Sequence, residues 1–167
     1  MTVKKIKDIE GGAFLYYPNV IKGIKKNSNP LQPIFEAFTN ALESLYALNK
    51  EINETSLKEY TICIRIYYSS LLLPDTPHKL NKIEVEDNGI GFNDSNFERF
   101  LRYKDSRKGY NNRGSGRVQF LHFFKNTKFE SVYPKDNDGF IKRSFFLTKE
   151  KIQNNIIGGI YADTDSE

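Results

Sequence analysis

The pattern of apolar and polar positions predicts a long amphipathic helix in the first third of the chain. Apolar residues recur there at close to 3.6-residue spacing, at Leu31, Ile34, Phe35, Phe38, Leu42 and Leu45. The tripeptide Ser28-Asn29-Pro30 lies just before them, and a capping side chain followed by proline is typical of a helix start. We therefore expect a helix over residues 30–50.

Two segments alternate with the period of two that predicts strands. Residues 60–68 place Ile62, Ile64 and Ile66 on one face. Residues 83–87 place Ile83, Val85 and Asp87 on one face, so a carboxylate ends a strand whose other inward side chains are apolar. The stretch 69–81 contains two prolines, and we expect it to be a loop between the two strands.

The remaining pattern predicts short helices, a loop and a hairpin. In chain order these are a helix over 93–104, a basic glycine-containing loop over 104–116, a helix over 118–124, and strands over 128–133 and 140–147. We expect residues 1–29 to wrap the edge of the domain, whereas residues 148–167 favour no single structure. Hairpin-paired strands with helices on one face predict an α+β fold, a two-layer α/β sandwich with a mixed, mostly antiparallel sheet.

Composition limits the classes of protein to which the chain can belong. Its 167 residues suffice for one domain with a core, and 38% hydrophobic and 28% charged content is ordinary for globular proteins. No apolar run approaches the about 18 residues of a membrane span, and no apolar segment follows the N-terminal lysines as in a secretory signal. The single cysteine, Cys63, excludes an internal disulfide and favours a packing role and a reducing, cytoplasmic location. The net charge of +4 permits phosphate or nucleic-acid binding without requiring either.

The hexapeptide Asp87-Asn88-Gly89-Ile90-Gly91-Phe92 follows the second strand and is the most informative stretch of the chain. A carboxylate at the rim of a core needs hydrogen-bond donors, and two glycines let a backbone approach a flat ligand. This combination suits recognition of an amino-bearing heterocycle. A tight turn after a strand has the same composition, so the hexapeptide alone leaves both interpretations open.

A second candidate group lies on the predicted long helix. Glu36, Asn40 and Glu43 are spaced i, i+4 and i+7, which puts them on one face, away from the centre of the apolar stripe. Asparagine is a poor helix former, and the neighbouring residues are small: Ala37, Thr39, Ala41 and Ser44. An amide oxygen suits Mg²⁺, and a carboxylate one turn away can orient or deprotonate a water that attacks a phosphate. Plain solvation of a polar helix face would give the same pattern.

A third candidate is the glycine-rich stretch 109–117, which precedes the helix predicted at 118. Glycines that lead into a helix N-terminus present backbone N–H groups to an anion. The same region is crowded with basic residues, namely Arg99, Arg102, Lys104, Arg107, Lys108, Arg113 and Arg117. An ordinary surface loop or a nucleic-acid contact would look similar.

The order of these three groups along the chain is more specific than any one of them. Over about residues 30–124, the chain resembles the ATP-binding domain, called the Bergerat fold, of the gyrase, heat-shock chaperone, histidine kinase and MutL superfamily. Residues 36–44 resemble its first box, residues 87–92 its second, and residues 113–117 its third, the phosphate-binding lid. Glutamate at position 36, together with two poorly placed histidines, His78 and His122, favours the MutL-like and chaperone-like ATPases over the histidine kinases.

The resemblance implies a role for each matching residue. Asp87 would accept a hydrogen bond from the adenine amino group, in a loop where Gly89 and Gly91 let the backbone approach the base. Asn40 would bind the Mg²⁺ that bridges the phosphates, and Glu36 would be the general base for hydrolysis.

The resemblance also implies a lid over residues 104–117. Gly114, Ser115 and Gly116 would cover the phosphates, whose charge would be neutralised by Lys104 or by an arginine, Arg107, Arg113 or Arg117. The implied module binds ATP and Mg²⁺, hydrolyses ATP, and switches conformation or forms a homodimer when ATP orders the lid.

The chain also departs from the family pattern. Glu43 stands where MutL-like relatives have Asp, and neither Thr148 nor Thr164 is well placed to be the threonine that backs the family's Asp. The catalytic lysine that such ATPases take from a second domain has no counterpart in residues 1–167. We therefore expect residues 1–167 to be a single domain of a longer protein, one that binds ATP and turns it over poorly by itself.

Two other interpretations remain open from the sequence. Segment 99–117 interleaves basic residues with Phe100, Tyr103 and Tyr110, which would suit a non-catalytic nucleic-acid-binding module. The other is a degenerate ATP domain that only scaffolds a partner, and the intact Asp87, Asn40 and Glu36 disfavour it.

Overall fold

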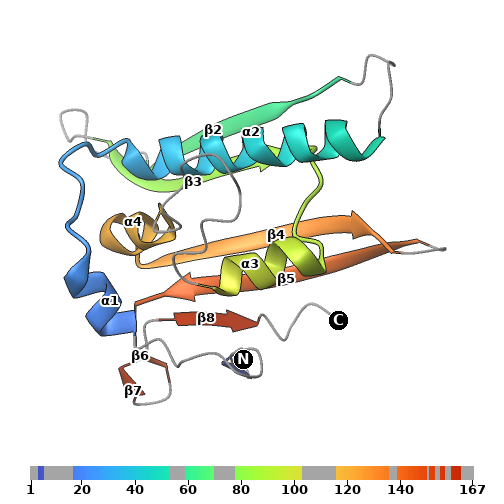
Figure 1. Ribbon diagram of the computed structural model, residues 1–167. Coiled ribbons are helices and arrows are strands. Elements are labelled where there is room, and N and C mark those ends of the chain that lie inside the picture. Colours follow the sequence, from blue (N-terminus) through green and yellow to red (C-terminus); the bar gives the residue numbers. More distant parts are fainter. Residues whose placement is uncertain are drawn as a thin grey trace. The chain divides into compact units, whose positions relative to one another are not determined.

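Helices and antiparallel sheets make this an α+β protein, as the sequence predicts (Figure 1). The computed structural model describes residues 4–5, 17–52, 59–69, 78–102, 116–135, 139–149, 151–152, 155–156 and 159–162. The helices are α1 (Tyr17–Gly23), α2 (Gln32–Ile52), α3 (Asp94–Leu101) and α4 (Gly116–Phe123). The strands are β1 (Lys4–Lys5), β2 (Ile62–Ser69), β3 (Lys79–Asp87), β4 (Asn126–Pro134), β5 (Phe140–Thr148), β6 (Lys151–Ile152), β7 (Asn155–Ile156) and β8 (Gly159–Ala162).

The chain divides into two compact units. Unit 1 comprises Met1–Pro33 and Gly91–Glu167, and unit 2 comprises Ile34–Ile90. The chain therefore passes from unit 2 to unit 1 inside the hexapeptide of residues 87–92, between its two glycines. The sequence predicts one domain without this division.

Asn29 begins the turn that starts α2. Its Oδ1 accepts a hydrogen bond from Leu31 N at 3.0 Å, and its carbonyl oxygen accepts from Gln32 N at 3.2 Å. This is the capping role that the sequence predicts for the region. The helix begins two residues later than expected, at Gln32, because Pro30 lies in the turn and not in the first helical turn.

The hairpin of β2 and β3 in unit 2 has one apolar face. Residues that face each other across an antiparallel pair share a face, and here the pairs are Ile62–Asp87, Ile64–Val85 and Ile66–Ile83. The predicted common face of Ile83, Val85 and Asp87 is therefore confirmed. Asp87 stands at the end of an otherwise aliphatic surface.

The opposite face of this hairpin is held by charged pairs. Arg65 contacts Glu86 at 2.5 Å, and Glu84 is paired with Lys82 and accepts a hydrogen bond from the Tyr67 hydroxyl at 2.6 Å. Lys82 and Tyr67 lower the pKa of Glu84, and the bond to Glu84 raises the pKa of Tyr67. The cross-strand pairs fix the register in which Asp87 lies opposite Ile62.

Strand β3 begins four residues earlier than the sequence predicts, at Lys79 instead of Ile83. Its first residues are mostly polar and exposed, so they carry no alternating pattern. They are extended because they pair with the end of β2, where Ser69 lies opposite Lys79 after a register shift at Tyr67 and Tyr68. The prediction of a loop over 69–81 was therefore wrong at both ends, and residues 70–77 lie outside the described part of the chain.

Helix α2 leaves several of its large apolar side chains exposed. Ala41 and Leu45 are buried, whereas Phe35, Phe38 and Leu42 remain 37–49% exposed. The predicted apolar stripe is therefore real as a pattern but does not form a closed core. The buried side is the one that borders Asn40, and small residues there let other backbone segments approach the helix.

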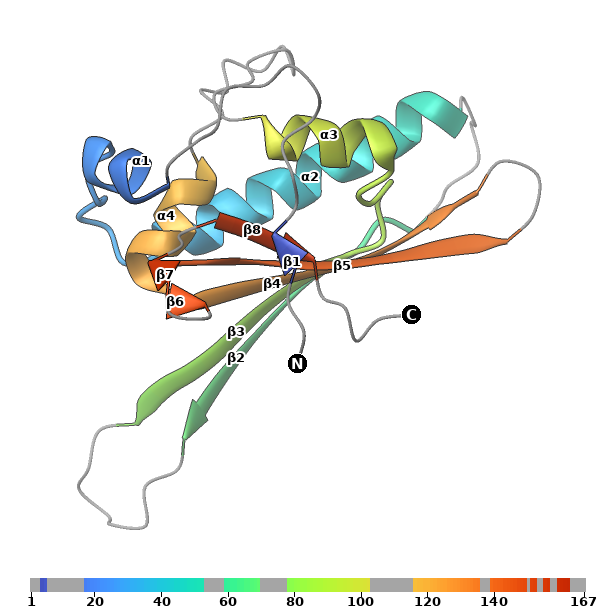
Figure 2. The same ribbon diagram turned by 90° about the horizontal axis from the view of Figure 1, so that it is seen from below.

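Unit 1 is built on a four-stranded sheet with the order β1-β8-β5-β4 (Figure 2). The predicted hairpin over 128–133 and 140–147 is confirmed as β4 and β5, which pair from Asn126–Thr148 to Pro134–Phe140. Strand β8 adds to β5 and β1 adds to β8, both antiparallel. The C-terminal segment, for which the sequence favours no structure, thus supplies one strand of this sheet and the separate β6–β7 pair.

An aromatic cluster fills unit 1. Phe129 and Phe145 lie opposite each other on β4 and β5 and stack with ring centroids 4.8 Å apart. Phe100 of α3 meets both rings, and Phe120 of α4 meets Phe129. Helices α3 and α4 therefore cover the same face of this hairpin.

Within the described residues, no helix has the length and apolar character required to cross a membrane.

Candidate functional site

The Asp87 carboxylate lies where the chain leaves β3. It is exposed, and its Oδ1 accepts a hydrogen bond from Gly89 N at 3.0 Å. Asn88 holds the turn, since its Oδ1 accepts from Thr61 N and its Nδ2 donates to Glu59 O, both at 2.8 Å. A carboxylate has about four acceptor positions, and the turn orients Asp87 by using one of them.

Gly89 lies against α2 so closely that no side chain fits between them. A Cβ at this position would stand 2.7 Å from the Ser44 carbonyl carbon, closer still to Ser44 Oγ, and 2.8 Å from Asp87 Oδ1. Ile90 N donates to Ser44 O at 3.3 Å, and the Ile90 side chain is buried. Residues 87–90 therefore dock on α2 at Ser44, within unit 2, and only glycine permits the approach.

Ser44 connects this turn to the polar positions of α2. Glu36, Asn40 and Ser44 follow at intervals of four in a continuous helix, so they form one ridge. Asn40 lies about 6 Å and Glu36 about 12 Å along the helix axis from Ser44. Asn40 is exposed, and Glu36 is partly buried. The turn that contains Asp87 and Gly89 thus lies at the Ser44 end of the ridge that also carries Asn40 and Glu36.

Gly91 has a backbone that other residues cannot easily adopt. Its φ is +69°, and a Cβ there would stand 2.5 Å from Ser131 Oγ and 3.1 Å from Val132 O. The positive φ and the close approach to β4 each require glycine at position 91, and both arise from packing within unit 1. The approach of Gly91 to an adenine base stays a prediction.

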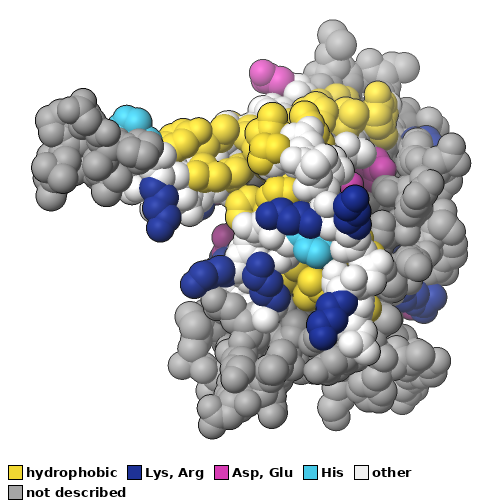
Figure 3. Space-filling model, turned by 90° about the vertical axis from the view of Figure 1, so that its left-hand side faces the viewer, with side chains coloured by type: hydrophobic (Ala, Val, Ile, Leu, Met, Phe, Trp, Pro, Cys, Tyr) yellow, Lys and Arg dark blue, Asp and Glu magenta, His cyan; other side chains and the backbone are white. Residues whose placement is uncertain are grey.

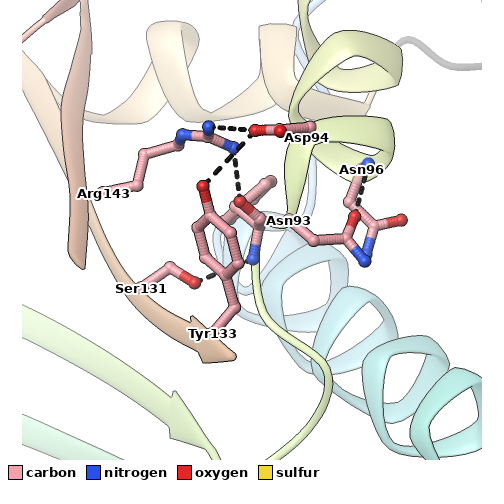
Figure 4. Close-up of polar contacts among 7 residues, drawn as sticks. Asn93, Asp94, Asn96, Ser131, Tyr133 and Arg143 are labelled. Atoms are coloured by element: carbon pink, nitrogen blue, oxygen red, sulfur yellow. Dashed lines mark hydrogen bonds and ion pairs between the residues drawn. The ribbon is translucent and has the colours of Figure 1, made fainter. Parts of the chain in front are cut away.

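Beyond Gly91, Arg143 ties the start of α3 to β5 (Figure 4). Its guanidinium donates to Phe92 O at 2.6 Å and to Asp94 Oδ1 at 2.5 Å, and lies over the Phe97 and Tyr133 rings. Arg143 lowers the pKa of Asp94, and burial raises the pKa of Tyr133. This network fixes the segment that follows the hexapeptide.

Sequence reasoning missed the Arg143 network because its partners are far apart in the chain and belong to no local motif. One local signal did exist at its edge. Asn93 caps α3 by accepting from Asn96 N at 2.9 Å, and an Asn-Asp pair before an apolar-periodic segment is a recognisable helix start.

Most of the predicted lid lies outside the described residues. This applies to Lys104, Arg107, Lys108, Arg113, Gly114 and Ser115. Gly116 is the first residue of α4. Arg117 is buried, donates to Arg102 O at 2.5 Å and lies over the Phe100 ring, so its guanidinium is engaged within unit 1.

The described part of segment 99–117 does not favour the nucleic-acid interpretation of that segment. Arg99 donates to Asn96, and Arg102 is paired with Glu98 on the same helix. With Arg117 buried, three of the basic side chains that prompted the interpretation serve the fold. Tyr103 and Tyr110 lie outside the described residues.

The structure also places the other side chains that the sequence singled out, apart from those outside the described residues. Thr148 is buried at the end of β5, where its hydroxyl donates to Lys125 O at 3.3 Å, and Thr164 lies outside the described residues. His122 Nε2 contacts Ile24 O at 2.7 Å. Cys63 is a free, partly buried thiol. In the described ranges, no three His, Cys, Asp or Glu side chains gather in a way that would hold a metal ion.

No protein-family model matches this chain, and neither does any curated protein. Its function is therefore inferred from the chemistry and geometry of its residues and from the order of its motifs.

Proposed function

We propose that this chain is a Mg²⁺-dependent ATP-binding module with the two-layer Bergerat fold, which hydrolyses ATP as part of a larger protein. The observation that carries the proposal is the docking of Gly89 on Ser44, with the Asp87 carboxylate at the same junction. Two motifs that are distant in the sequence thereby meet within unit 2. A simple turn after a strand would not need a glycine fitted to the helix that bears Asn40 and Glu36.

Asp87 gives the module its preference for adenine. An ionised carboxylate only accepts hydrogen bonds, and the exocyclic amino group of adenine is a donor. Guanine has a carbonyl oxygen at the corresponding position, which would face the carboxylate with no proton between them. The bond from Gly89 N orients Asp87 and leaves further acceptor positions for the base.

The donor set on α2 fits magnesium and hydrolysis. Asn40 offers a hard amide oxygen from an exposed helix position, and bound Mg²⁺ would neutralise phosphate charge. Glu36 takes a proton from the water whose oxygen attacks the γ-phosphorus, and ADP leaves with the electron pair of the broken P–O bond. As the family resemblance implies, ATP binding would drive conformational switching or homodimerisation of the larger protein.

A thermal-shift titration tests this proposal. Mg-ATP raises the melting temperature of the wild-type chain, because a ligand bound only to the folded state adds about 2.7 kcal/mol at 100 times Kd. Asp87→Asn removes most of that gain, since a hydrogen bond to a charged group contributes about 1.5–3 kcal/mol.

Glu86→Gln is the matched control for this titration. Glu86 is the neighbouring residue, is exposed and points to the opposite face of β3. The control variant keeps the wild-type response to Mg-ATP. A wild-type chain that does not respond to ATP, or an equal response in Asp87→Asn, contradicts the proposal.

A further inference from the structure

A second feature of unit 1 is a fixed connection between α4 and the loop that follows α1. Asn27 N donates to Gln119 Oε1 at 3.1 Å, and Gln119 Nε2 donates to Lys25 O at 3.2 Å. His122 Nε2 lies 2.7 Å from Ile24 O. Three polar contacts between segments that are distant in the sequence hold this loop in one conformation on α4.

The joined segments carry positive charge only. Residues 19–35 and 116–129 contain no Asp or Glu. Their exposed basic side chains are Lys22, Lys25, Lys26, Lys125 and Lys128, of which Lys128 pairs with Glu130. Lys125 has a contact of its own, so we call Lys22, Lys25 and Lys26 the basic face. Among the described residues, no ion pair is formed by Lys22, Lys25 or Lys26, and Lys26 lies 4.4 Å over the Phe123 ring.

Figure 3 shows several Lys and Arg side chains on this side of the molecule, among neutral and hydrophobic ones. Within residues 19–35 and 116–129, the exposed large hydrophobic side chains are Leu31 and Phe35, at the start of α2, and none lies among residues 19–29 or 116–129, which carry the lysines. A membrane-binding surface would combine basic residues with apolar side chains that insert between lipids, and the lysine-bearing segments lack that component. Several exposed lysines on joined segments that contain no Asp or Glu match a polyanion whose charges are regularly spaced.

We propose that the basic face binds the phosphodiester backbone of a nucleic acid without reading its sequence. The lysines form charge-assisted contacts to phosphates, and the released counterions drive binding. Its lysines do not belong to segment 99–117, and its action does not depend on ATP binding by unit 2.

Fluorescence anisotropy with a labelled 20-base-pair duplex of mixed sequence tests the proposal, in the absence of nucleotide. Three lysine contacts predict that the logarithm of the binding constant falls with the logarithm of salt concentration with a slope of about −2.7. Lys25→Glu with Lys26→Glu weakens binding at least about tenfold at 50 mM salt and makes the slope shallower by about 2.

Two further variants make the result specific. Lys79→Glu with Lys135→Glu changes the net charge equally at exposed positions elsewhere, and it leaves most of the binding intact. Lys26→Glu removes the contact of Lys26 with Phe123 and could lower the melting temperature. Lys22→Glu with Lys25→Glu keeps that contact, and we expect it to weaken duplex binding as much as Lys25→Glu with Lys26→Glu does.

The outcomes that overturn the proposal are equally definite. They are a wild-type chain that fails to bind the duplex at 50 mM salt, and an equal loss in the Lys79/Lys135 variant. Stronger binding to vesicles with 30% phosphatidylserine than to the duplex would assign the face to membranes instead. If Arg107→Glu with Lys108→Glu abolishes duplex binding and the variants of the basic face do not, duplex binding belongs to segment 99–117.

Discussion

Gly89 and Ser44 meet within unit 2 with no space between them for a side chain. The Ser44 carbonyl carbon stands 2.7 Å from the position of a Gly89 Cβ, and Ser44 O accepts a hydrogen bond from Ile90 N at 3.3 Å. The contact positions the turn after β3 on the helix that carries Asn40. It therefore has consequences for stability as well as for the proposed function.

Gly89→Ala should destabilise the chain by about 1–3 kcal/mol, because an added methyl group in a filled space forces backbone shifts. The obstructing atoms include the α2 backbone, which cannot rotate away. Gly23→Ala is the control, since a Cβ at Gly23 would meet nothing within 4 Å. Urea denaturation of both variants checks this prediction, and equal midpoints would contradict it.

Gly91→Ala should cost more than Gly139→Ala. Both glycines have positive φ, +69° and +88°, so both variants bear the strain of the left-handed region, about 1–2 kcal/mol. Only at Gly91 would the new Cβ also meet Ser131 Oγ, at 2.5 Å. The loss of unfolding free energy in Gly91→Ala minus the loss in Gly139→Ala gives the cost of the close approach to β4. Equal losses would mean that β4 moves away from the new methyl group without cost.

The pair of Asp94 and Arg143 should contribute to stability in an acid-dependent way. Arg143 lowers the pKa of Asp94, so the contribution is fully present above the unfolded-state pKa of about 3.9 and is lost as pH falls through the lower folded-state pKa. Asp94→Asn should lower the melting temperature at pH 7 by about one or two degrees, since the carboxylate is exposed to solvent.

Melting temperatures recorded from pH 2 to pH 7 check the sign of this effect. The wild-type and Asp94→Asn curves should converge at the acid end. A gap that stays constant with pH would show that the Asp94 side chain acts through hydrogen bonds or packing that do not depend on its charge.

Under the proposed function, Glu36→Ala should abolish ATP turnover and spare ATP binding. Removal of a general base lowers the rate by about 10²–10⁴. Phosphate release gives the rate, and a filter-binding assay with labelled ATP gives the affinity. Equal loss of both would contradict the role of Glu36 as a base and would make it a binding residue.

The sequence predicts the local parts of the fold well, because period and capping are local properties. The 3.6-residue pattern predicts α2, and the two-residue alternation predicts the common face of Ile83, Val85 and Asp87. The start of β3 could not be predicted in this way. Lys79 and its neighbours are mostly polar, and only their partners on β2 make them a strand.

The site could be predicted in its residue types but not in its packing. The i, i+4 spacing of Glu36 and Asn40 is readable from the sequence, whereas the docking of Gly89 on Ser44 joins two segments with no local signal. The burial of Ala41 and not Phe38 likewise depends on tertiary structure, since a helix pattern indicates an apolar stripe but not which part is covered. Arg117 illustrates the same limit, because a basic residue beside glycines is buried on Phe100.

The most direct measurement of the central claim is isothermal titration calorimetry of the chain with Mg-ATP and with Mg-inosine triphosphate. The two nucleotides differ at the purine position that faces Asp87 in the proposal, where adenine has an amino group and hypoxanthine a carbonyl oxygen. We predict saturable binding of ATP and at least about tenfold weaker binding of inosine triphosphate, because a carboxylate left facing an acceptor loses at least one charge-assisted hydrogen bond. Equal affinities, or no binding of ATP, would contradict the account.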